Sequence, residues 1–220
     1  MADRFQLIAI DRRGFGRSTA PPDLNREVAD LVAVRDALGL DRMVMVGMSQ
    51  GGRVALHFAL GYPESVAAIV LQGTPLDGFL PTPRREDAIP LSAFVALARQ
   101  GRLDRMKELW RAHPLMRAGT TEAQEKIDAM LADYEGRDLI AAAPHELATI
   151  ADDLRAVHAP ALVVTGEQDT AGRKLVGDAL AYGMVHSRRA TIAGAGHLCN
   201  LSHPAEFNAL LADFAASIAG

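Results

Sequence analysis

Cysteine, aromatic residues and an excess of charge of either sign are all scarce in this sequence. Its 220 residues include one cysteine, Cys199, which excludes an internal disulfide and a thiolate metal cluster. Lys and Arg number 23 against 27 Asp and Glu, a net charge of −4, which argues against a nucleic-acid surface or a basic membrane patch. No apolar run approaches the ~18 residues that a membrane span needs. We therefore expect neither a nucleic-acid nor a membrane partner.

Signs of export are also missing at the N-terminus. Residues 1–5 contain no apolar core and no small-residue cleavage site, so we expect a cytoplasmic protein. The composition, 49% apolar and 23% charged, excludes wholesale disorder. The length corresponds to one domain and is sufficient to bury a core.

Short apolar runs alternate with helical patterns along much of the chain. The patterns predict strands at 5–10, 43–47, 66–71, 161–165 and, most weakly, 189–193. They predict helices at 28–38, 50–61 and 204–218. Continuous apolar strands that alternate with helices are typical of a parallel sheet covered on both faces. We expect an α/β fold with a mainly parallel sheet.

The segment 76–157 has a different pattern, with helical stretches and no strand runs. We interpret it as a helical cap inserted into a core made of residues 1–75 and 158–220. Its large apolar side chains indicate either a lid over an apolar pocket or, as the favoured interpretation, ordinary packing within the cap. These residues are Met106, Trp110, Leu115, Met116, Met130 and Leu131.

The best candidate nucleophile is Ser49, in the G-x-S-x-G sequence at residues 47–51. The motif follows a predicted strand and opens a predicted helix, which is the sharp turn that lifts a serine hydroxyl clear of the backbone. The turn crowds its neighbours, which explains glycine at 47, 51 and 52. The alternative is a glycine-rich connection with a serine of no function.

A serine needs a base, and His197 is the best placed because it follows the last predicted strand. Asp169 follows the strand before that and is the candidate acid that orients the imidazole. Its competitors are Glu167 and Asp77, and the alternative for Asp169 is a turn or helix-cap residue. The other histidines fit a catalytic role less well: His57, His113, His145, His158, His186 and His203.

Four motifs in this order make the chain resemble the α/β-hydrolase family, of the esterase, lactonase and cofactor-free haloperoxidase type. Asp11-Arg12-Arg13-Gly14-Phe15-Gly16-Arg17-Ser18 resembles the family's D-x-R-G-x-G-x-S loop. The turns at 47–52, 166–169 and 194–197 resemble its nucleophile, acid and histidine turns. The resemblance implies the catalytic set Ser49, Asp169 and His197, with the backbone N–H of Gln50 as oxyanion donor.

The resemblance also implies a departure at the front of the chain. The family has three strands before the Asp11 loop, and a His-Gly loop after the third donates another oxyanion N–H. Loss of one such donor typically costs ~10²–10³ in rate. The shortened front has three explanations: a fragment, a natural short protein, or a strand at 5–10 that moves beside 43–46 and brings the amides of 12–16 toward the site.

We expect a serine hydrolase acting on a small-molecule carboxylic ester or lactone through an acyl-enzyme, with no metal and no organic cofactor. A perhydrolase or a carbon–carbon bond hydrolase is an alternative on the same fold. A catalytically poor scaffold with a binding role or none is the alternative from another class. The open sheet edge left by the shortened front predicts a homo-oligomer.

Overall fold

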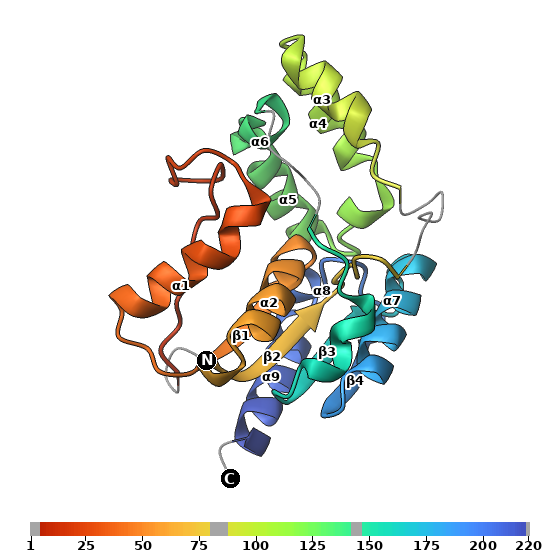
Figure 1. Ribbon diagram of the computed structural model, residues 1–220. Helices are drawn as coiled ribbons and strands as arrows, with labels where there is room; N and C mark the ends of the chain where they lie inside the picture. The colour runs from red at the N-terminus through yellow and green to blue at the C-terminus, as the bar shows by residue number, and fades with distance from the viewer. Residues whose placement is uncertain (1–4, 80–87, 142–146, 219–220) are drawn as a thin grey trace.

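Within the residues that the structure describes, the protein contains one parallel sheet of four strands. The computed structural model describes residues 5–79, 88–141 and 147–218. The strands are β1 (Met43–Met48), β2 (Val66–Gln72), β3 (Ala161–Gly166) and β4 (Ser187–Ile192), and they lie side by side in this order (Figure 1). All three neighbouring pairs are parallel, which confirms the predicted fold class.

Helices connect the strands, as parallel pairing requires. The helices of the sheet-forming part are α1 (Glu27–Ala37), α2 (Gln50–Gly61), α7 (Ala171–Gly183), α8 (Cys199–Ser202) and α9 (Pro204–Ile218). Between β2 and β3 lie α3 (Leu91–Arg99), α4 (Leu103–Arg111), α5 (Thr121–Asp133) and α6 (Arg137–Ile140). Within the described ranges, every helix is too short or too polar to cross a membrane.

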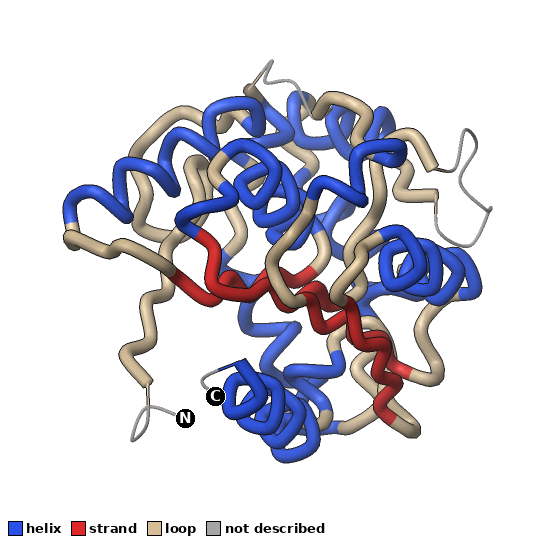
Figure 2. Tube along the Cα trace, turned by 60° about the horizontal axis from the view of Figure 1, so that its bottom comes forward, coloured by secondary structure: helices blue, strands red, loops and turns tan. Residues whose placement is uncertain are grey.

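The two faces of the sheet are covered unequally, as Figure 2 shows with α9 on one side and most helices on the other. Ile69 and Leu71 of β2 pack in a cluster with α2 and α7. The residues that alternate with them along the strand, Ala68 and Val70, face the second cluster, with Phe207 and other residues of α9. This alternation buries β2 on both faces, so its carboxyl end is held rigidly in the sheet.

The prediction of a strand at 5–10 is wrong. No ladder pairs this segment within the described residues, and Leu7, Ile8 and Ile10 are exposed. An apolar run becomes a strand only when a neighbour satisfies its backbone groups, and here β1 pairs with β2 alone. On the face of β1 opposite Met43 and Met45, Val44 and Val46 are 43% and 54% exposed.

Helices α3–α6 lie together beyond the carboxyl ends of the strands (Figure 1). Met106, Leu115 and Leu131 are buried, in keeping with the favoured packing interpretation, whereas Met130 is 65% exposed. The division into core and cap stays a proposal. Residues 150–157, which that division places in the cap, contribute Ile150, Leu154 and Val157 to the main core cluster.

These helices contact the rest of the protein on two sides. Arg137 on α6 donates to the backbone oxygens of Gly16 at 2.7 Å and Ser18 at 2.8 Å. On the other side, Ile127 of α5 belongs to an apolar cluster against which Leu198 and Leu201 pack. The cap helices therefore contact both the loop after residue 10 and the segment that follows His197.

Candidate active site

Ser49 occupies a strained turn between β1 and α2. Its φ of 49° and ψ of −117° make it the one non-glycine residue of the described ranges with a positive φ. Such a conformation costs about 1–3 kcal/mol and is typical of functional turns. Its carbonyl oxygen accepts the N–H groups of Gly52 and Arg53 at 3.0 and 3.3 Å. The Gln50 N–H belongs to the first turn of α2, where amides have no intrahelical acceptor.

Close packing explains two of the three glycines at this turn. A Cβ on Gly47 would lie 2.5 Å from the Cα of Gly52, and a Cβ on Gly52 would lie 1.9 Å from Thr74 Oγ1. Gly51 differs, because a Cβ there would meet no atom within 4 Å. The expectation that crowding requires glycine at residue 51 is therefore wrong.

His197 and Asp169 form a buried pair. His197 Nδ1 lies 3.0 Å from Asp169 Oδ2, and the two side chains are 4% and 0% exposed. The other carboxylate oxygen accepts the backbone N–H of Thr170 at 2.8 Å. Each oxygen of the carboxylate therefore has a partner. Because Nδ1 of His197 contacts Asp169, Nε2 of His197 is the ring nitrogen that is left to exchange a proton.

Glu167, a competitor for the acid, has a different position. Its Oε2 accepts the backbone N–H of Gly194 at 2.8 Å. The N–H of the next residue, Gln168, donates to the carbonyl of Ala195, also at 2.8 Å. These bonds fasten the acid turn to the histidine turn, so Glu167 contacts the turn that carries His197 rather than its imidazole.

Asp77, the second competitor, is neutralised by another side chain. Arg53 on α2 donates to both of its carboxylate oxygens, at 3.0 and 2.6 Å. Burial alone would raise the pKa of Asp77, but contacts with His57 and Arg53 outweigh it and lower the pKa below its usual range. An aspartate held in this way is not free to orient His197.

The end of β2 lies between the serine turn and the histidine turn. The main-chain carbonyl of Gln72 accepts the N–H of Ser49 at 2.8 Å. The side-chain Nε2 of Gln72 donates to the carbonyl of His197 at 3.0 Å. Sequence reasoning missed this residue. The available signal was a polar side chain directly after the apolar run 66–71, because a polar group at a buried strand end needs a hydrogen-bond partner.

The loop of Arg12 reaches the same region. Arg12 binds both carboxylate oxygens of the buried Glu27, at 2.5 and 2.8 Å, and donates to Gln50 Oε1 at 3.2 Å. Gly14 and Gly16 have φ of 83° and 50°, as tight turns require. The premise that a strand at 5–10 would carry the amides of 12–16 into the site is not met.

Cys199 follows the histidine turn and is fully buried in the cluster formed with α9. Burial, together with the nearby charge of Asp169, raises the pKa of its thiol to about 12. Cys199 is therefore protonated at neutral pH and packs as a small apolar residue.

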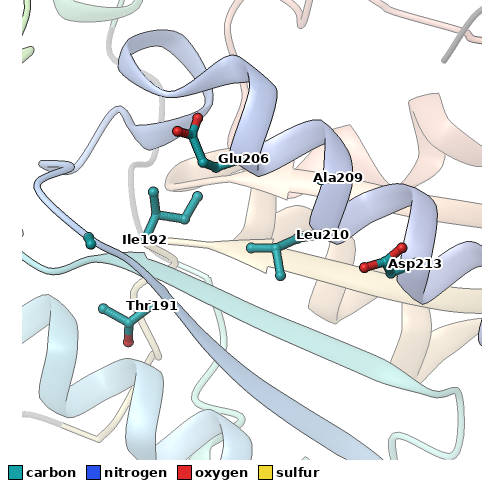
Figure 3. A pocket seen from close by; sticks show the side chains of 7 residues that line it. Thr191, Ile192, Glu206, Ala209, Leu210 and Asp213 are labelled. Atoms are coloured by element: carbon teal, nitrogen blue, oxygen red, sulfur yellow. The ribbon is translucent and has the colours of Figure 1, made fainter.

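A separate groove of about 390 Å³ lies along the outer strand β4 and helix α9 (Figure 3). Ile192 reaches it from β4, and Glu206, Leu210 and Asp213 reach it from α9. The seven lining residues include none of the proposed catalytic three. The groove is therefore distinct from the site at the end of β2.

Comparison with known proteins agrees with this architecture. A family model described as the alpha/beta hydrolase fold matches residues 1–204. A 2-hydroxy-6-oxononadienedioate/2-hydroxy-6-oxononatrienedioate hydrolase of Paraburkholderia phymatum is 30% identical, over 96% of this chain and 76% of that protein.

Solved structures are similar over the same extent. An esterase from Thermogutta terrifontis is 25% identical with a TM-score of 0.77, over 94% of this chain and 78% of that one. An N-acyl homoserine lactone degrading enzyme, Est816, is 28% identical with a TM-score of 0.70, over 93% of this chain and 80% of that one.

Proposed function

The chain belongs to the α/β-hydrolase fold family, and within it we propose a serine hydrolase whose nucleophile, base and acid are Ser49, His197 and Asp169. The observation that carries this proposal is the buried contact of 3.0 Å between His197 Nδ1 and Asp169 Oδ2. A buried carboxylate that accepts from one imidazole nitrogen leaves the other as a general base.

The proposed reaction passes through an acyl-enzyme on Ser49. Ser49 Oγ attacks the carbonyl carbon of the substrate and passes its proton to His197 Nε2, while Asp169 stabilises the imidazolium. The N–H of Gln50, at the start of α2, donates to the oxyanion. His197 then protonates the leaving alcohol, and water, activated by the same imidazole, releases the acid from the acyl-enzyme.

We favour a neutral carboxylic ester or lactone as the substrate. Two arginines near the proposed nucleophile are both occupied by carboxylates of this chain: Arg12 by Glu27 and Arg53 by Asp77. Arg111 of the cap is likewise bound to Asp128, at 2.7 Å. Two further arginines of the segment 76–157, Arg84 and Arg85, lie outside the described residues. Arginines that are already paired favour an uncharged acyl group over a free carboxylate.

Carbon–carbon bond hydrolysis is the second candidate. The observation that favours it is the 30% identity, along almost the whole chain, with a hydrolase named for a 2-hydroxy-6-oxo dienedioate. The same three residues would serve, because this reaction also requires proton transfer and an activated nucleophile at a carbonyl. The substrate would carry two carboxylates, which Arg12, Arg53 or Arg111 could bind only by giving up the carboxylate of this chain that each one holds.

Fluorophosphonate labelling followed by intact mass and peptide mapping tests the catalytic set. We expect labelling at Ser49 that disappears in Ser49→Ala and falls at least ~10³-fold in His197→Ala. His186→Ala, an exposed histidine, is the matched control and should label as the parent does. A folded parent that is not labelled would instead support the scaffold without catalysis.

A substrate panel then separates the two reactions. Short-chain esters and lactones are compared with a chromophoric 2-hydroxy-6-oxo dienoate, whose absorbance falls on cleavage. Faster turnover of the dienoate would replace the ester proposal with carbon–carbon hydrolysis.

We also propose that the chain forms a homo-oligomer. Strand β1 is an end strand of the sheet with no further strand beside it among the described residues, and Val44 and Val46 on one of its faces are exposed. Open apolar edges favour association.

A further inference from the structure

Gln72 joins the two segments that carry the proposed nucleophile and base. It is the last residue of β2, between β1 and β3 in the sheet, and is 1% exposed. Its main-chain carbonyl accepts the N–H of Ser49 at 2.8 Å. Its side-chain amide donates to the carbonyl of His197 at 3.0 Å. One residue of the rigid sheet therefore contacts both segments directly.

The acceptors around Gln72 determine the orientation of its amide. Nε2 donates to the carbonyl of His197 and to Asn200 Oδ1, at 3.0 and 2.9 Å, so both amide protons are used. If the amide were turned so that Oε1 took the place of Nε2, Oε1 would face the carbonyl oxygen of His197. Oε1 is buried and finds no partner within the described residues. Because an unpaired buried oxygen costs about 1–3 kcal/mol, a glutamine is a poor choice here for packing alone.

Gly73, the next residue, brings the strand end beneath the imidazole. Its φ is 54°, and a Cβ there would lie 2.6 Å from His197 Cε1 and 2.7 Å from Nδ1. The ring thus rests on the backbone of Gly73 while Gln72 holds the main chain of the same histidine. These contacts determine where the ring lies, whereas Asp169 determines its orientation and tautomer.

We propose that Gln72 is a positioning residue for the base. Its amide holds the main chain of His197 in place, so that the imidazole stays opposite Ser49, whose own N–H is bonded to Gln72. The role rests on the proposed function. Because a misplacement of about 1 Å can cost ~10²-fold in rate, loss of the amide slows the chemical step without weakening substrate binding.

The test uses Gln72→Met, which fills similar space and donates no hydrogen bond. Both the rate constant and the final stoichiometry of fluorophosphonate labelling at Ser49 are measured. We expect full stoichiometry with a rate constant about 10–100-fold lower, and a similar loss in kcat for an ester with KM unchanged. Asn200→Ala is the matched control. It removes the other acceptor, keeps the bond to His197, and should stay within about threefold of the parent.

Two results would overturn the role of Gln72. One is a parental rate constant in Gln72→Met. The other is a lower stoichiometry in which the remaining sites react at the parental rate, because that is the effect of a residue that only maintains folding.

Gln72→Glu keeps the test decisive if the methionine variant does not fold. A buried carboxyl has a raised pKa, donates one O–H when protonated and none when ionised. The ratio of its labelling rate to that of the parent should fall between about pH 5 and about pH 9. A constant ratio would contradict the proposal.

The parent protein separates this inference from the proposed function. A parent that is not labelled at Ser49 would overturn both. Labelling that requires His197 but is unaffected by Gln72→Met would overturn the role of Gln72 alone.

Discussion

Glu167 Oε2 accepts the backbone N–H of Gly194 at 2.8 Å, which joins the turn of the proposed acid to the turn of the proposed base. Glu167 and Asp169 are two residues apart, and only Asp169 contacts the imidazole. The two carboxylates therefore have different expected roles. Glu167 holds the backbone turn at Gly194, whereas Asp169 orients the imidazole and stabilises its protonated form.

Substitution of the two carboxylates should separate these roles. Asp169→Asn should lower kcat for an ester by about 10³–10⁴-fold, because the amide favours the wrong imidazole tautomer. Glu167→Gln keeps an oxygen acceptor for Gly194 and should retain activity within about threefold. Steady-state kinetics on both variants checks the assignment, and a larger loss in Glu167→Gln would reverse it.

The glycines after Ser49 should differ in their tolerance of a methyl group. Gly52→Ala forces a Cβ against Thr74, so we expect a loss of about 1–3 kcal/mol in the free energy of unfolding. Gly51→Ala enters open space in α2 and should leave the stability unchanged or raise it by up to about 1 kcal/mol. Urea denaturation of both variants measures the difference. Equal losses would contradict the packing described for the turn.

Cys199 should be inert toward thiol reagents in the folded protein. With a pKa of about 12, only about one thiol in ten thousand is ionised at pH 8, and the side chain is fully buried. We expect no reaction with a disulfide reagent over hours, and complete reaction after unfolding in guanidinium. Inactivation of the native enzyme by the reagent, absent in Cys199→Ala, would show instead that the thiol is accessible from the site.

The Arg53–Asp77 pair should contribute stability that depends on pH. Because the folded state lowers the pKa of Asp77, its contribution is complete above the unfolded pKa of about 4 and disappears as the pH falls through the folded value. Asp77→Asn should therefore lower the urea midpoint at pH 7, with the gap to the parent closing below about pH 4.

Asp128→Asn provides the control for this pH dependence. Asp128 pairs with Arg111 on the surface, where ion pairs contribute about 0–1 kcal/mol, so its effect at pH 7 should be small. If the two substitutions lowered the urea midpoint equally, the burial of Asp77 would add nothing to the stability that its ion pair contributes.

The proposed homo-oligomer should depend on the outer side of β1. Light scattering should give a mass above the 23.5 kDa of one chain. Val44→Lys combined with Val46→Lys places charge on the exposed face of this end strand and should give the monomer mass with the same circular dichroism. A monomeric parent would contradict the proposed oligomer. An oligomeric double variant would show that the chains contact one another through a different surface.

Local patterns predicted most of the fold because they reflect local physics. The apolar run 66–71 is a strand buried on both faces, and the motif at 47–51 is the strand-to-helix turn that its glycines indicated. The run 5–10 has a similar composition and is not a strand, because pairing depends on a neighbour that no local pattern describes. The bond from Gln72 to His197 spans 125 residues, a contact that only the folded chain creates.

The apolar contact between α5 and the segment after His197 links distant parts of the chain. Ile127 on α5 packs in the cluster that holds Leu198 and Leu201, on either side of the start of α8. The residues that directly follow the imidazole therefore take part of their packing from a helix inserted between β2 and β3. The position of the proposed base thus depends on that helix as well as on the sheet.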